Sequence, residues 1–503
     1  MNLSSWHLRT GSVVLAWLLA LLAVALAHPL VPESQWLLVH LLALGAASNA
    51  ILIWSWYFTE SVLKLSHQER RRSQAARLAI FNLGAIAVIV GFTSGVWFSV
   101  LAGGSAVAVT IMWHTGALLR QFHFASSSRF DPMIRYYLAG CVALPVGIGL
   151  GITMAYGDLS GTWHARFTVA HAVINFLGWI GLTVVGTLIM LGATVLRTRM
   201  ADGLEKAADR GLPVLILAIC LAVAGAMFGL LPLTAAGIVM YVAAVAFVLW
   251  PHIEELRRKH PVSYASMSML AGLFWLLGSL LVLSAGLAWA SNWFEAEDRL
   301  GWILVPLAVG FLAQVLLGAL SYLLPVALGK RPSATAASTA ALNRAADARI
   351  AMVNAGLLVS VLPLPNPVRL LCSIVAGATL AAFIPLALRA AVLARRASAG
   401  PVARGTRKTP PPIRTRRRLG FASIGVAVVV LAATTGVVIN HVGLNSAVSL
   451  KTGAGGHATT VDVRVEALRY VPATIEGVCP EGIGSWSSWR TPATNATTWS
   501  SPP

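Results

Sequence analysis

The chain has 503 residues, of which 57% are hydrophobic and only 11% are charged, and its formal net charge is +19. A soluble domain carries roughly a quarter charged residues, so this composition excludes an ordinary soluble protein and indicates a chain surrounded mostly by lipid. The positive charge does not indicate nucleic-acid binding, because the basic residues form short clusters between apolar runs, as membrane topology requires.

Thirteen apolar segments predict thirteen membrane-spanning helices, since a span needs about 20 apolar residues. The predicted spans are residues 11–30, 36–57, 78–101, 104–120, 134–155, 166–196, 212–231, 234–251, 265–290, 302–326, 350–364, 367–393 and 419–440. The segment 350–364 is short for a span. Ala25 and Ala27 before His28 also fit a signal-peptide cleavage site, although the second span follows at once. No internal repeat is evident in the sequence.

The predicted fold class is therefore an all-α polytopic membrane protein followed by a short β segment. Residues 1–393 form a twelve-helix membrane domain, 394–418 a basic Pro-rich cytoplasmic linker, 419–440 an anchor helix and 441–460 a flexible spacer. In residues 461–476, "VDVRVEALRYVPATIE", alternating apolar residues predict a half-buried strand and then a turn into a second strand. The tail 477–503 has no such period.

The basic residues predict the orientation of the spans. With the N-terminus in the cytoplasm, 30 of the 37 Lys and Arg residues fall in cytoplasmic segments, and the C-terminus lies outside. Positive charge is retained on the cytoplasmic side of membrane proteins. We therefore expect a multi-pass protein of the bacterial cytoplasmic membrane, with the lipid bilayer as its main surrounding.

Three histidines fall inside predicted spans, where a polar side chain is a candidate functional group. They are His40, His114 and His171, and His164 lies two helical turns before His171 on roughly the same face. His40 and His171 lie at similar predicted depths, about 6–8 Å below the outer boundary at 1.5 Å per residue. Gly178 follows on the face of His171, where it would let a flat ring approach closely.

Equal depth is what two ligands of one haem or one metal ion require, and neutral imidazole is a good ligand for iron. The candidate cofactor-binding residues are thus His40 and His171, with His114 as a third ligand and His164 nearby. Hydrogen bonding between helices is the alternative role for each. No CxxCH sequence occurs, so a covalently attached c-type haem is excluded, and a haem would be of the b type.

The sequence resembles the bacterial membrane-anchored copper oxidases related to copper nitrite reductase. The resemblance covers residues 1 to about 476 and is carried by "LVHLLALGAASNAILIWSWYF", "HARFTVAHAVINFLGWIGLTVVGTLIMLGATVLRTRM", "VGFLAQVLLGALSYLLPVALG" and the cupredoxin-like "VRVEALRYVPATIE". In this family a multi-helix membrane region precedes a cupredoxin and multicopper-oxidase-type domains outside the membrane. The membrane part is also loosely similar to haem-copper oxidase subunit I and to NnrS-type membrane proteins, but it lacks the adjacent His-His pair and the late HxH motif of subunit I.

The resemblance implies an oxidoreductase whose haem-bearing bundle takes electrons from quinol and passes them to copper proteins or copper domains on the outer side. It assigns no copper ligand to this chain, because the His, Cys and Met ligands of full-length relatives lie in domains that have no counterpart here. Residues 477–503 fit a cupredoxin read out of frame, which predicts a frameshift near Glu476, and a genuine disordered outer tail is the alternative. The alternatives are a transporter or sensor bundle and a purely structural membrane anchor.

Overall fold

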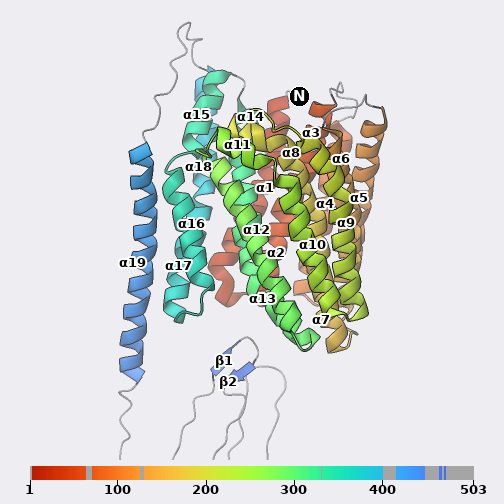
Figure 1. Cartoon of the computed structure of the whole chain (residues 1–503), viewed down its shortest axis with the longest axis vertical. Helices are drawn as coiled ribbons and strands as arrows, with labels where there is room; N and C mark the ends of the chain where they lie inside the picture. Colours follow the sequence, from red (N-terminus) through yellow and green to blue (C-terminus); the bar gives the residue numbers. More distant parts are fainter. Residues whose placement is uncertain are drawn as a thin grey trace, which may run out of the picture. The chain divides into compact units, whose positions relative to one another are not determined.

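The computed structural model describes residues 3–63, 71–124, 130–329, 331–399 and 415–447, and the strand residues 464–466 and 469–471. The chain divides into two compact units, Met1–Gly443 and Leu444–Pro503. The first is a bundle of helices (Figure 1), and the hydrophobic core runs through it. In the second, β1 (Arg464–Glu466) pairs antiparallel with β2 (Arg469–Val471), with Val465 opposite Tyr470.

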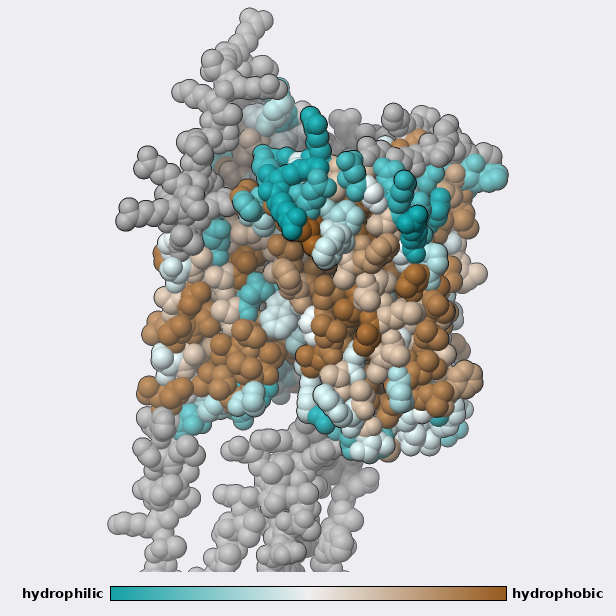
Figure 2. Space-filling model, viewed as in Figure 1, coloured by the Kyte–Doolittle hydropathy of each residue, from teal (hydrophilic) through white to brown (hydrophobic). Residues whose placement is uncertain are grey.

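Among the described residues, twelve helical stretches are long and apolar enough to cross a membrane, which confirms the prediction of a helical, multi-pass protein. They are Arg9–Leu30, Ser34–Val62, Arg71–Thr93, Trp97–His123, Asp131–Tyr156, Gly161–Leu196, Leu204–Phe228, Leu231–Leu249, Tyr264–Trp289, Trp293–Leu328, Asn366–Ser398 and Gly420–Asn440. On the face shown in Figure 2, hydrophobic residues fill the middle of the bundle and hydrophilic residues gather at the end that carries α11 and α15.

Three predicted spans differ from the structure. Residues 350–361 of the predicted span 350–364 lie in α16 (Ala346–Val361), whose 16 residues extend about 24 Å, less than the roughly 30 Å of a bilayer core. The predicted boundary between 78–101 and 104–120 is wrong, because the chain turns at residues 94–96. Gly95 has a φ of +69°, which glycine adopts readily, and the Thr93 and Ser94 hydroxyls donate to carbonyls of the preceding turn.

One order of helices occurs three times along the chain. Each four-helix set has an uninterrupted α-helix, a long span interrupted by a π-helical segment, and then two further helices. The first set is α1 (Leu3–Ala27), α2 (Ser34–His40) with η2 (Leu41–Ala47) and α3 (Ser48–Val62), α4 (Arg71–Thr93) and α5 (Trp97–Phe124). The second is α6 (Asp131–Tyr156), α7 (Gly161–Val173) with η3 (Ile174–Gly181) and α8 (Leu182–Leu196), α9 (Leu204–Phe228) and α10 (Leu231–Leu249).

The third set is α12 (Tyr264–Trp289), α13 (Trp293–Val305) with η4 (Pro306–Ala313) and α14 (Gln314–Leu328), α16, and α17 (Asn366–Ala381). In every set the first helix packs on the π-helical segment, and the third helix packs on the fourth. Outside the sets lie η1 (His28–Leu30), α11 (His252–Arg258), α15 (Pro332–Leu342), α18 (Phe383–Ala399) and α19 (Thr415–Ala447). The repeat corrects the sequence interpretation, in which no repeat was evident.

A buried polar cluster joins the helices of the first set. The indole Nε1 of Trp17 on α1 donates to Asn82 Oδ1 on α4 at 2.6 Å. The amides of Asn82 and Asn49 donate to each other at 2.8 and 3.0 Å. Gly45 lies against the Trp17 ring, where an added Cβ would come within 2.5 Å of a ring carbon.

The third set repeats this cluster with equivalent residues. Trp275 Nε1 on α12 donates to Asn354 Oδ1 on α16 at 2.8 Å, and the amides of Asn354 and Gln314 donate to each other at 3.0 and 3.1 Å. Gly310 lies against the Trp275 ring at 2.6 Å from the position of an added Cβ. The helices that carry the two asparagines share a motif, "RLAIFNLG" at 77–84 and "RIAMVNAG" at 349–356.

The remaining predictions about the C-terminal part have only partial structural counterparts. The anchor segment 419–440 lies within α19, which contacts α16 and α17 at Gly425 and Gly436. Residues 441–447 of the predicted flexible spacer instead continue α19. Residues 400–414 of the predicted linker, 448–460 of the spacer, 461–463, 467–468 and 472–476 of the cupredoxin-like segment, and the tail 477–503 lie outside the described residues. The two three-residue strands are what the structure describes of that segment.

Candidate functional site

Two of the four candidate histidines come together. His40 is the last residue of α2, directly before η2, and His171 lies near the end of α7, before η3. Their ring centroids are 6.3 Å apart, and the ring planes differ by 29°. The two histidines that the sequence placed at one depth are thus direct neighbours in the structure.

Both imidazoles are fixed through the same nitrogen. His40 Nδ1 lies 2.8 Å from the carbonyl oxygen of Trp36, and His171 Nδ1 lies 2.8 Å from that of Gly147 on α6. A carbonyl oxygen can only accept, so each Nδ1 carries the proton, and in a neutral ring the Nε2 lone pair is free. Hydrogen bonds from the second ring nitrogen to a carbonyl are typical of histidines that ligate a metal.

Two glycines of α6 leave room for the side chains of His171 and of Asn175. An added Cβ at Gly151 would lie 3.0 Å from His171 Cε1, and one at Gly147 would lie 2.3 Å from Asn175 Oδ1. Asn175 in turn donates to the carbonyl of His171 at 2.8 Å. The sequence indicated a glycine beside His171 but pointed to Gly178, which instead packs against Ala143. The relevant glycines lie on a neighbouring helix, which sequence spacing alone does not reveal.

An aromatic stack extends from His40. The Trp36 ring lies 3.9 Å from the His40 ring, centroid to centroid, and 3.8 Å from the ring of Phe92 near the end of α4. These pairs are nearly parallel, with interplanar angles of 21° and 10°. The stack holds the His40 ring from one side and carries a continuous aromatic surface from the histidine pair to the end of α4.

The other two candidates lie elsewhere. His114 on α5 is fully buried, and its Nε2 lies 3.0 Å from Ser55 Oγ on α3, beside the Trp56 ring. The structure thus gives His114 the interhelical hydrogen bond that was its alternative role. His164 near the start of α7 is exposed. Neither residue has a contact with the His40–His171 pair among those that the structure describes.

The number of ligands distinguishes the groups that the pair could hold. No cluster of three or more His, Cys, Asp or Glu side chains that could hold a metal ion occurs within the described ranges. A bare zinc ion takes three or four protein ligands, whereas a haem takes one or two, because the macrocycle supplies the other nitrogens. Two imidazoles on one metal have ring centres about 6 Å apart when each metal–nitrogen bond is 2.0–2.1 Å. The 6.3 Å between the ring centroids of His40 and His171 is close to that spacing.

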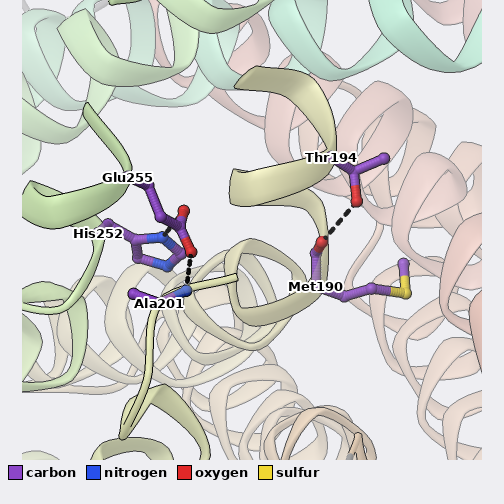
Figure 3. Close-up of polar contacts among 5 residues, drawn as sticks. All are labelled: Met190, Thr194, Ala201, His252 and Glu255. Carbon is purple, nitrogen blue, oxygen red and sulfur yellow. Dashed lines mark hydrogen bonds and ion pairs between the residues drawn. The ribbon is translucent and has the colours of Figure 1, made fainter. Parts of the chain in front are cut away.

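Sequence reasoning missed one buried polar contact, which lies at the end of the bundle that carries α11. Figure 3 shows His252 and Glu255 of α11 beside the backbone at Ala201. Glu255 is fully buried and accepts from Ala201 N–H at 2.9 Å and from His252 Nδ1 at 2.6 Å. An added Cβ at Gly192 would lie 2.6 Å from His252 Cε1. The contact joins two connections between spans that are about 50 residues apart in sequence.

The chain matches no known protein-family model, and no curated protein is significantly similar to it.

Proposed function

We propose that this chain is the membrane portion of a redox protein, in which His40 and His171 hold one b-type haem that transfers electrons. The observation that carries the proposal is the geometry of the pair, with rings 6.3 Å apart and both Nδ1–H groups bonded to backbone carbonyls. A bound haem supplies the one-electron chemistry. The residues of the chain orient the two imidazoles, and Trp36 and Gly151 pack against them.

The proposed partners follow from the resemblance to membrane-anchored copper oxidases. Quinol in the bilayer is the electron donor, and copper redox domains or proteins on the outer side are the acceptors. The segment 461–476 is then the start of a cupredoxin, and the tail after Glu476 is its frameshifted continuation. We assign no copper site to this chain, so its part of the oxidoreductase activity is electron delivery.

The proposed topology has thirteen spans in the bacterial cytoplasmic membrane, with α16 counted as one and α19 as the last. The N-terminus is cytoplasmic and the C-terminus is outside. The hydrophilic end of the bundle in Figure 2 supports this orientation, because α11, with Arg257 and Arg258, belongs to that end. Under this topology the His40–His171 pair lies in the outer half of the membrane, toward the copper partners.

The test is a reduced-minus-oxidised absorption spectrum of the purified full chain in detergent. We expect the paired α and Soret bands of a b-type haem, and their loss in His171→Ala. His164→Ala is the matched control, because His164 is an exposed histidine on the same helix and should retain the full haem content. Size-exclusion chromatography checks that each variant is folded.

A folded, monodisperse chain without haem, purified from haem-replete cells, would contradict the proposal and favour a transporter, sensor or anchor. Equal loss of haem in His164→Ala and His171→Ala would show that the effect is not ligation by the pair.

A further inference from the structure

The three long spans meet around one cavity that is only partly enclosed. Its volume is about 80 Å³, and its lining comes from α3, α8 and α14, with the preceding π-helical segments and Met269. These are the spans that each four-helix set contributes as its second member. π-Helical segments inside α-helices occur frequently at functional sites.

The lining repeats with threefold regularity. Counted from the fifth residue of each π-helical segment, which is Gly45, Gly178 or Gly310, the lining positions recur at the same offsets. Offset two gives Ala47, Ile180 and Leu312, and offset five gives Ala50, Thr183 and Val315. Offsets six and nine also place a lining residue on every span. The cavity therefore lies where the three sets converge.

The cavity presents an apolar surface, although three hydroxyl-bearing residues line it. Thr183 Oγ1 donates to the Trp179 carbonyl and Thr187 Oγ1 to the Thr183 carbonyl, each at 2.7 Å. Ser55 Oγ is bonded to His114 Nε2. A water molecule in a protein interior needs two to four polar partners. The lining hydroxyls already have partners within the protein, so an ion or a hydrogen-bonding ligand gains little here.

We propose that this cavity is a binding site for one small apolar molecule of the size of xenon or a diatomic gas. An engineered apolar cavity of roughly 150 Å³ stays dry and binds benzene or xenon, so a smaller cavity selects a smaller guest. Ala47 and Ile180 lie seven and nine residues after His40 and His171 on the same spans. The cavity thus begins about 10–14 Å along those helices from the histidine pair. The site does not depend on haem binding.

Xenon is the probe for the test. Crystals of the full chain are pressurised with xenon, and the expected result is one anomalous peak between α3, α8 and α14. Ala319→Leu and Ala50→Leu fill the cavity from two different spans, so that one variant suffices if the other does not fold. We expect each to weaken xenon binding about tenfold or more, because the inserted methyl groups occupy the space of the guest.

Ala102→Leu on the exposed face of α5 is the matched control and should leave the peak unchanged. The proposal is overturned if the unmodified protein shows no xenon between the three spans, or if both filled variants retain the peak. Ordered water or a detergent chain in the same place would overturn it as well, since either would show a different occupant.

Discussion

The first and third four-helix sets share their architecture but differ at the position of His40. Both join their helices through a Trp–Asn–amide cluster, with Trp17, Asn82 and Asn49 in one set and the equivalent residues in the other. Five residues before the π-segment glycine, however, the first set has His40 and the third has Val305. The shared residues hold the scaffold, and the residue that breaks the repeat is the one with a candidate function.

The second set differs in the opposite way. Gly178 meets Ala143 where Gly45 meets Trp17, and four residues later Leu182 stands where the other sets have an amide. This set lacks the polar cluster at those positions but contributes His171, together with Gly147 and Gly151 that accommodate it. The candidate site is thus formed where two of the three similar sets differ from the repeat, with one histidine from each of them.

The largest expected effect separates His40 from its equivalent in the third set. His40→Ala removes one of the two proposed axial ligands, so we expect complete loss of the b-type haem bands. Val305→Ala changes the equivalent position of the third set, at the end of α13, and should leave the haem content unchanged. Haem per protein in the two purified variants, measured by the pyridine haemochrome spectrum, checks the prediction. If His40→Ala retained the full haem content, the proposed functional difference between the first and third sets would be contradicted.

Hydropathy predicted the helices well, because length and composition alone decide whether a segment can cross a bilayer. It failed at residues 94–96, where the turn lies inside an otherwise apolar run. Helical depth also predicted that His40 and His171 would lie at one level. Their carbonyl partners, Trp36 and Gly147, were not predictable, since one depends on side-chain rotation and the other on the packing of a different helix.

The repeat escaped detection for a physical reason. Lipid-facing and packing positions accept almost any apolar residue, so only the few polar contacts keep their identity between sets. Those contacts are far apart in sequence, as for Trp17 and Asn82, and their spacing changes because α15 is inserted before α16 in the third set. Once the helices are placed, the hydrogen bonds of the two clusters match partner by partner.

The second prediction removes the central amide of each cluster. Asn82→Leu leaves Trp17 Nε1 and the Asn49 amide without their partner, and Asn354→Leu does the same to Trp275 and Gln314. A buried polar group that loses its partner costs about 1–3 kcal/mol, so we expect each variant to lose about 2–4 kcal/mol of unfolding free energy. Denaturant unfolding in detergent measures it.

The exposed Asn366 provides the control, because Asn366→Leu alters an asparagine for which no hydrogen bond is described. If the two cluster variants differed by more than about 1.4 kcal/mol, a factor of ten in the unfolding equilibrium, the clusters would not be equivalent in energy.

The smallest expected effect concerns the glycines that accept the two indole rings. Gly45→Ala and Gly310→Ala place a methyl group about 2.5–2.6 Å from the Trp17 and Trp275 rings, which is well inside contact distance. Overpacking of this kind costs about 1–3 kcal/mol, and we expect a loss in that range from both variants by the same unfolding measurement. Gly149→Ala on α6 meets no atom within 4 Å, so it should be neutral or stabilise the protein by up to about 1 kcal/mol through helix propensity. If Gly45→Ala left the unfolding free energy unchanged while Gly310→Ala lowered it, Trp17 would be able to move aside for the added methyl group and Trp275 would not.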